Sequence, residues 1–560
     1  MSKAFTELRS VVNDLSDTDS MADFNRVRHE SMDMSDIEDD GPETTPVEPP
    51  NDTAEDSCED EEPLQSKDWK LLWCSSPFIR KTGSSKKKLK LKPGPTKYAS
   101  SHAKDIKSCF QLFMPNSIEN IILHMTNKEG RRVHKESWTM LDRIDLQAFT
   151  GLMILTGVYR SKNESIESLW HDRTGRAIFQ TAMPVNQFLN ISRIVRFDDH
   201  ETTCARFQKD TLAPIRDVWD KWVDLLPCMY NPGPEVTVGE RLVPFRGHCP
   251  FRHYTLRKPG RCGIKLWVAC DAKSSYAWNV QLDAGKAADG KAEKNRGARV
   301  VLDVTQGLRG HNVTCDRSLT SYALGKELLK RKLTMVGAVR QSKPELPPQL
   351  VDTKGRGIFS SKFAFTQTHA LVSYIPRKYQ NVLVMSTRHS GAGVSSKVSK
   401  KPSLILDYDR YKRGVDNLNR SINAYSCKQK TNRWPLVLFF TMLDVSAYNA
   451  SVVWTEVNPD WNKVKFAKRR TFLEELGKAL VSPQMERRKP VPRPYTCASD
   501  TTVKEQAAVK PPDANSTPSK SKRKRCRVCA RNKTSTVCQN CNAYICKVHA
   551  VITTRCYSCK

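Results

Sequence analysis

Hydrophobic and polar positions follow two different periods along this chain, and the change of period divides it into regions. From residue 103 to 234 the apolar residues recur at helical spacing, and MPVNQFLNISRIVRF places Phe188, Ile191 and Ile194 on one stripe. The stretch DLQAFTGLMILTGVY is apolar on more than one face, which is typical of a buried helix. We therefore predict a helical segment over residues 103–234.

From residue 235 the pattern changes to short β-type runs, namely VTV, CGIKLWVACD, YAWNVQL and HNVTCD. An amphipathic helix, TSYALGKELLKRK, and another strand, LTMVGAV, come next. Strands that alternate with helices predict an α/β core. The segment 345–400 is rich in strands and loops, and helical patterning returns over residues 414–480.

The two ends of the chain differ from the middle in composition. Residues 1–102 are poor in aromatics and rich in Ser, Asp, Glu and Pro, so we predict a disordered tail, first acidic and then basic. Its basic part, SSKKKLKLKPGP, is either a nuclear import signal or a solvated lysine run, and on the first interpretation the protein is nuclear. Residues 481–522 are rich in Pro, Lys and Ser, which predicts a linker.

The net charge of the chain is +31, although residues 1–66 hold 20 acidic and only 4 basic side chains. The remaining body is therefore even more basic than the whole, which favours a nucleic acid as the partner. We find no secretory signal. We also expect no membrane span, because the best apolar runs, 146–159 and 435–454, are too short or carry Asp444 and Asn449.

Residues 523–560 form a separate cysteine-rich module with metal-ligand spacing. Zn²⁺ takes four Cys or His ligands, so the eight ligands here, in four pairs with two-residue gaps, predict two structural zinc ions. Because the middle pairs are close in sequence, we expect an interleaved arrangement. One ion would be bound by Cys526, Cys529, Cys546 and His549, and the other by Cys538, Cys541, Cys556 and Cys559.

Several long motifs, in one order along the chain, resemble the piggyBac transposase family over residues 103–560. They are VTVGERLVPFRGHCPFRHYTLRKPGRCGIKLWVACDAKSSYAW, NVTCDRSLTSYALGKELLKRKLTMVGAVR, YDRYKRGVDNLNR, KQKTNRWP and the cysteine module. The resemblance implies a ribonuclease-H-like core at 235–425 with an aspartate triad and an insertion at about 345–400. It also implies helical dimerisation or DNA-binding segments at 103–234 and 426–480, a homodimer, and a zinc domain that reads transposon-end DNA.

The resemblance also implies the positions of the catalytic carboxylates. Asp316 and Asp416 match the second and third aspartates of the family, whereas Gly239 stands at the first and Asn419 at a further one. The family excises its element at TTAA sites and reinserts it. Such chemistry uses two divalent ions held by carboxylates, so magnesium is expected only if the protein is catalytically active.

We expect the carboxylate set to be insufficient. Glu240 follows Gly239, but a shift of one residue along a strand turns a side chain to the opposite face. Asp271 is another carboxylate of the core, which we interpret as structural. If lost ligands are the only defect, Gly239→Asp with Asn419→Asp should partly restore cleavage, unless Arg317, Ser318 and Leu319, which also depart from the family, matter too.

Three functions remain open at this point. The chain is most simply a transposase-derived DNA-binding protein without catalytic activity. The first alternative is an active cut-and-paste transposase in which Glu240 or Asp271 substitutes. The second is an interaction protein, because two-zinc modules also occur in ubiquitin ligases and histone readers, although the basic SKSKRKRCR before the module favours DNA.

Overall fold

The computed structural model describes residues 63–78, 89, 91–161, 164–254, 262–284, 295–463, 467–488, 524–529, 533–534, 536 and 543–549. The helices are α2 (Lys97–His102), α3 (Ile106–Gln111), α4 (Asn116–His134), α5 (Arg143–Val158), α6 (Ile166–Leu169), α7 (Ala177–Ala182), α8 (Val185–Ile194), α9 (His200–Phe207), α10 (Arg216–Met229), α11 (Arg296–Val304), α12 (Tyr322–Lys330), α13 (Pro348–Val351), α14 (Ser403–Tyr411), α15 (Gly414–Ala424), α16 (Trp434–Val457) and α17 (Lys468–Arg487). The strands are β1 (Leu64–Gln65), β2 (Leu72–Trp73), β3 (Gly94–Pro95), β4 (Tyr230–Asn231), β5 (Glu235–Pro244), β6 (Arg252–Tyr254), β7 (Cys262–Asp271), β8 (Ala277–Leu282), β9 (Asn312–Cys315), β10 (Thr334–Ala338), β11 (Ser361–Phe365), β12 (Ala370–Arg377), β13 (Gln380–Ser386), β14 (Lys524–Arg525) and β15 (Lys533–Thr534).

A mixed sheet forms the centre of the molecule. Strands β5, β7 and β8 are an antiparallel meander, and β9 and β10 run parallel to β5 on its other side. The order β8-β7-β5-β9-β10, with α11 before β9 and α12 between β9 and β10, is the arrangement expected for a ribonuclease-H-like core. Strand β9 ends beside Val238 of β5, while β5 continues to Pro244. The carboxyl ends of parallel strands are where ligands gather in open α/β sheets.

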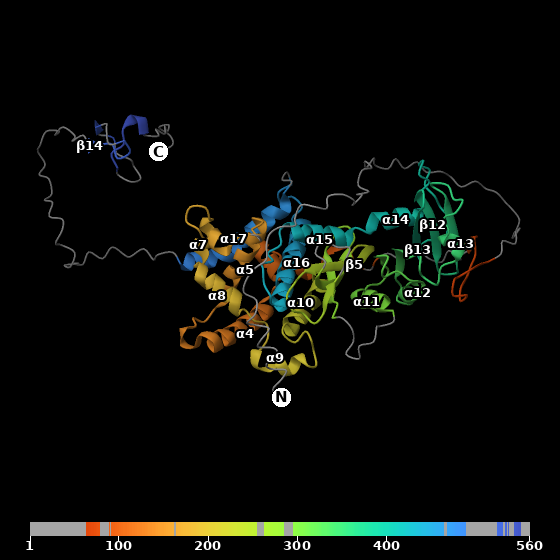
Figure 1. The fold of residues 1–560 in the computed structure, drawn as a ribbon, viewed down its shortest axis with the longest axis horizontal. Coiled ribbons are helices and arrows are strands. Elements are labelled where there is room, and N and C mark those ends of the chain that lie inside the picture. The colour runs from red at the N-terminus through yellow and green to blue at the C-terminus, as the bar shows by residue number, and fades with distance from the viewer. Residues whose placement is uncertain are drawn as a thin grey trace, which may run out of the picture.

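The segment between β10 and α14 extends the same sheet. Strand β13 pairs antiparallel with β10, and β12 and β11 follow outward, so the strand-rich segment expected at 345–400 is continuous with the core. Figure 1 shows β12, β13 and α13 on one side of the molecule and the helices α4, α5, α7, α8 and α17 on the other. The core strand β5 lies between these two parts.

Helices pack around α16, whose side chains are nearly all buried. Asn449 of α16 bonds both the N–H and the C=O of Ala277, and Ser446 accepts a bond of 2.9 Å from the indole of Trp222. Of the described helices, α16 alone is long and apolar enough to cross a membrane, but 89% of its apolar window is buried against protein. Its apolar character is therefore explained by its place in the core.

The stripe predicted in MPVNQFLNISRIVRF is buried on α8, and α5 is buried on nearly all sides. Both patterns were read with the helical period, and both helices follow it. At the other end, α17 runs to Arg487, several residues into the region interpreted as a linker. Pro483 lies within α17, so the proline-rich composition that suggested a linker is partly that of a helix.

Part of the region expected to be a disordered tail has a defined place in the structure. Residues 63–78 form a short hairpin that lies on the insertion, with Trp73 fully buried and its indole bonded to the carbonyl of Glu345. Residues 94 and 95 pair with β4, and α2 follows. These contacts join residues far apart in sequence, so local composition gave no sign of them. Residues 1–62 and 489–523 lie outside the described residues.

Candidate functional site

The sequence placed Gly239 just after a strand, whereas the structure places it inside β5, paired with Val268 of β7. The parallel pairing of β5 with β9 ends one residue earlier, at Val238 and Cys315. Gly239 and Asp316 are thus the next residues on two adjacent parallel strands. A Cβ atom added to Gly239 would lie 3.4 Å from Oδ2 of Asp316. A side chain at 239 would therefore point at this carboxylate.

Helix α15 covers this part of β5. An added Cβ on Gly239 would also lie 3.3 Å from Cβ of Val415, and Thr237 donates a bond of 2.7 Å to the carbonyl of Tyr411. Asp416, in the first turn of α15, is exposed to solvent. The structure thus brings Gly239 against Asp316 and sets the residue before Asp416 beside them.

Tyr408 and Cys315 report on the charge of Asp316. Burial raises the pKa of the Tyr408 hydroxyl, and the carboxylate of Asp316 raises it further. The pKa of the Cys315 thiol is likewise raised, first by burial and then by Asp316. The carboxylate of Asp316 therefore lies close enough to Tyr408 and Cys315 for its charge to act on both.

Glu240 lies on the other face of β5 from Gly239. Its carboxylate forms an ion pair of 2.7 Å with Nζ of Lys265, whose ammonium also lies over the ring of Trp267. The alternation of a strand separates this carboxylate from Asp316. Glu240 thus points away from Asp316 and pairs with Lys265, so it does not supply the carboxylate that is missing at position 239.

The carboxylate of Asp271 accepts hydrogen bonds at the turn between β7 and β8. Its Oδ1 accepts from the N–H of Gly233 at 2.7 Å, and its Oδ2 accepts from the N–H and the hydroxyl of Ser274, also at 2.7 Å. The carboxylate is 3% exposed. Three short bonds to a buried carboxylate are typical of a structural role, as the sequence analysis assumed.

The side chain of Asn419, one helical turn after Asp416, is hydrogen-bonded to a residue of β5. Its Oδ1 accepts a bond of 2.9 Å from Nη1 of Arg241, a buried residue of β5. Sequence reasoning missed Arg241. The available signal was its position two residues after Gly239, on the strand face that packs on α15. Of the other residues that depart from the family, Leu319 is buried and Arg317 is exposed.

The cysteine module brings one of the two expected ligand sets together. The ligand atoms of Cys526, Cys529, Cys546 and His549 all lie within 4.8 Å of one another. The Sγ atoms of Cys529 and Cys546 are 3.8 Å apart, and Sγ of Cys546 is 3.2 Å from Nδ1 of His549. A tetrahedral site with Zn–S bonds of about 2.3 Å has an S–S edge of about 3.8 Å, so the cluster fits a metal ion of this kind.

Backbone geometry supports this cluster. The pKa of the Cys526 thiol is lowered to about 6, because N–H groups of Cys546, and then of Cys529, donate to its sulfur. The thiolate, which is the form that binds metal, is therefore favoured at neutral pH. Strands β14 and β15 pair antiparallel, and β14 directly precedes Cys526. The second expected set, Cys538, Cys541, Cys556 and Cys559, lies outside the described residues.

The fold and this site define a class. A sheet of order β8-β7-β5-β9-β10, with Asp316 directly after one parallel strand, is the ribonuclease-H-like fold of a solved piggyBac transposase. The family model described as "Transposase IS4" matches residues 106–451, more than half of the chain. The chain belongs to this transposase family, and its relatives are of the piggyBac type.

Two curated human relatives are PiggyBac transposable element-derived proteins 2 and 3. The first is 21% identical over 379 residues, covering 62% of this chain and 62% of the relative. The second is 23% identical over 398 residues, covering 64% and 63%. The chain thus spans less than two thirds of the length of these relatives. A solved piggyBac transposase synaptic complex with hairpin DNA is 29% identical, covers 84% of this chain and 100% of that one, and gives a TM-score of 0.68.

Proposed function

We propose that this protein is a piggyBac-transposase-derived DNA-binding protein that does not cut DNA. The observation that carries the proposal is Gly239, which contributes no carboxylate in front of Asp316, although a side chain there would reach it. Two divalent ions need several carboxylates to neutralise them. Asp316 and Asp416 are the inherited pair, with Gly239 and Asn419 at the other two positions, and the residues present do not fit a two-metal site.

Two observations support DNA binding, namely the positive net charge of the chain and its similarity to a transposase solved with DNA. The chain carries +31, and a piggyBac transposase of the same fold is known in complex with hairpin DNA. The proposed partner is double-stranded DNA that resembles a transposon end, bound by a nuclear homodimer whose module holds two zinc ions. In a gel-shift titration, affinity for such DNA should fall steeply between about 50 and 200 mM salt, because released counterions drive the binding. Absence of binding would favour a protein-interaction role for the module.

The decisive test of lost catalysis is a plasmid excision assay on the unaltered protein. We expect no precise excision of an element with piggyBac-type ends above background. A known active piggyBac transposase on its own element serves as the positive control. Excision clearly above background would refute the proposal and favour the active transposase.

Gly239→Asp tests whether position 239 is the place of a missing metal-binding carboxylate. Gly239→Asn is the matched control, because its side chain has almost the same size and no charge. Two carboxylates about 5 Å apart repel by roughly 3 kcal/mol at an effective dielectric of 20. Gly239→Asp should therefore unfold at lower urea than Gly239→Asn in EDTA, and Mg²⁺ should remove the difference. The steric effect on Val415 is common to both variants. Equal responses of both variants to Mg²⁺ would show that position 239 is not a ligand position.

A further inference from the structure

Helix α15 lies along β5 and meets it at three successive levels. The first level is Thr237, which lies against Gly414 at the start of α15, and the second is Gly239, which lies against Val415. Thr237 also donates to the carbonyl of Tyr411, the last residue of α14. The third level is Arg241, which contacts the helix one turn further on. Thr237, Gly239 and Arg241 share one face of the strand because side chains alternate. The helix that carries Asp416 is therefore fixed by these three strand positions.

Arg241 forms the polar contact at the third level. Its Nη1 donates to Oδ1 of Asn419 at 2.9 Å, and its Nη2 donates to Oδ1 of Asn423 at 3.5 Å. The residue is only 5% exposed, and neither acceptor carries a charge. Burial lowers the pKa of Arg241, and the charge of Asp444 opposes this effect. A guanidinium in such a place keeps its charge and needs acceptors.

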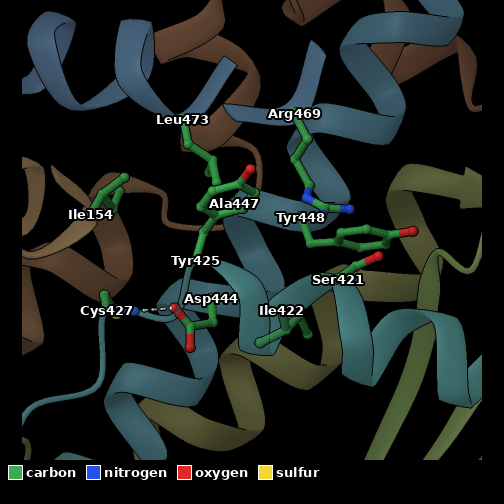
Figure 2. A pocket seen from close by; sticks show the side chains of 10 residues that line it. All are labelled: Ile154, Ser421, Ile422, Tyr425, Cys427, Asp444, Ala447, Tyr448, Arg469 and Leu473. Carbon is green, nitrogen blue, oxygen red and sulfur yellow. Dashed lines mark hydrogen bonds between the residues drawn. The ribbon is translucent and has the colours of Figure 1, made fainter. Parts of the chain in front are cut away.

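Asp444 is the anionic group of α16 that acts on Arg241. It accepts from the hydroxyl of Ser426 at 2.5 Å and from the N–H of Cys427 at 2.9 Å. Figure 2 shows this carboxylate beside a cavity of about 20 Å³ that Ser421 of α15 and Arg469 of α17 also line. The charge of Asp444 on α16 thus acts on the buried cation of β5, while the hydrogen bonds of Arg241 go to α15.

A metal ion and a guanidinium place different demands on position 419. Divalent ions such as Mg²⁺ prefer carboxylates, whereas a guanidinium bonds a neutral amide oxygen well. With Gly239 and Asn419 in place of two carboxylates, little negative charge remains to hold a metal ion on this face, and Arg241 supplies a permanent cation instead. The amide of Asn419 also donates to the carbonyl of Glu240 at 3.4 Å, a bond that a carboxylate could not make.

We propose that Arg241 has taken over from a metal ion the task of holding α15 on β5, so that residue 419 is a structural acceptor for Arg241 and not a metal ligand. This inference rests on the proposed loss of catalysis. It also changes the expectation from sequence that Asn419→Asp would help to rebuild the metal site. A carboxylate at 419 would form an ion pair with Arg241, which adds the attraction of opposite charges to the hydrogen bond that the guanidinium already makes to residue 419.

The test compares urea unfolding midpoints of the full chain with EDTA and with Mg²⁺. Asn419→Asp should raise the midpoint in EDTA, because the gained ion pair outweighs the long bond lost to Glu240, and Mg²⁺ should shift it no more than it shifts the unaltered protein. Arg420→Asp, at the next and exposed position of α15, is the control for added charge and should not raise the midpoint. A lower or unchanged midpoint for Asn419→Asp in EDTA, or recovery by Mg²⁺, would overturn the inference.

A double-mutant cycle tests whether the rise in the unfolding midpoint of Asn419→Asp comes from Arg241. In the Arg241→Gln background, Asn419→Asp should no longer raise the midpoint, and a rise of equal size would overturn the role of Arg241. If Arg241→Gln does not fold, Asn419→Asp alone decides the matter by its midpoints in EDTA and Mg²⁺. Excision by the unaltered protein would refute the proposed loss of catalysis, but it would leave the metal-free midpoint of Asn419→Asp as a separate result.

Discussion

Gly239 brings only a hydrogen atom to the space in front of Asp316, and this has a consequence for the stability of the core. A carboxylate pair on β5 and β9 repels unless metal ions lie between them, by roughly 3 kcal/mol at about 5 Å. A glycine at 239 removes that repulsion when no metal is bound. The close approach of Val415 to this position is also relieved, since an added Cβ would lie 3.3 Å from its own Cβ. Loss of this carboxylate is therefore compatible with an intact fold.

Asp444 gives the clearest pH dependence at the scale of one residue. Burial raises its pKa above the ordinary value, although bonds from Ser426 and Cys427 oppose the shift. Between the unfolded pKa, about 3.9, and the raised folded one, the folded state keeps a proton that the unfolded state releases. The free energy of unfolding contributed by this group therefore falls as pH rises through that window.

Asp444→Asn removes this titration. We expect its free energy of unfolding, relative to the unaltered protein, to increase from pH 4 upward and to level off above the folded pKa. Urea unfolding at several pH values measures the difference. Asp460→Asn is a suitable control, because the side chain of Asp460 is 85% exposed and pairs with the nearby Lys463 at the surface. Parallel curves for Asp444→Asn and the unaltered protein would contradict the assignment.

Among the elements, α5 and α17 make the closest crossing. A Cβ added to Gly151 would lie 2.9 Å from the carbonyl oxygen of Gly477, and one added to Gly477 would lie 2.6 Å from Cγ of Leu155. Real Cβ atoms do not approach so closely, so the two helices can meet only where both carry glycine. The crossing joins α5, which precedes the sheet in sequence, to α17, which follows it, across more than 300 residues of sequence.

Gly477→Ala should therefore destabilise the protein by about 1–3 kcal/mol, because overpacking outweighs the higher helix propensity of alanine. Glu475→Ala, at an exposed position of the same helix, is the control and should change stability by less than about 0.5 kcal/mol. The free energies of unfolding in urea give both values. Equal values for the two variants would mean that the crossing can open without cost.

Over the whole molecule, the small cysteine module depends on a different source of stability from the rest. The described part of the core buries a large hydrophobic cluster. Among the described residues of the module, those that are buried are Cys526, Thr534, Ala543 and Cys546, and two of these are ligands of the metal cluster. In such a module the free energy of metal binding is the free energy of folding. Loss of metal should therefore act on the module and leave the core intact.

Chelation by EDTA should collapse the amide NMR dispersion of residues 524–549, while the thermal midpoint of the core stays within about 1 °C. Cys546→Ser should reproduce the collapse without chelator, because it removes one ligand of the cluster. Cys204→Ser, at an exposed cysteine of α9, is the control. Unchanged dispersion of the module's signals after chelation would refute the metal assignment.

The sequence predicted what depends on local period and on long motifs. The stripe of α8 and the strands β5, β7, β9 and β10 follow from patterns within a few residues of one another, although β5 runs past Gly239, where the pattern predicted its end. Arg241 was missed because a charged residue in a strand is usually exposed, and its acceptors on α15 are 178 and 182 residues away. The bond between Trp73 and Glu345 spans 272 residues and was missed for the same reason. Long-range pairing of polar groups leaves no period in the sequence.

The short hairpin before the body of the molecule has a consequence for self-association. Strand β11 is the last strand of the sheet, and its Phe365 exchanges backbone bonds of 2.9 and 2.7 Å with Cys74. An open strand edge is a template on which another chain can add. Cys74 therefore occupies the backbone groups of this edge at Phe365, the last residue of β11. A shortened chain that starts after residue 78 would leave the backbone N–H and C=O of Phe365 without Cys74 and would expose the apolar surface that now covers Trp73. We expect such a chain to be prone to aggregate.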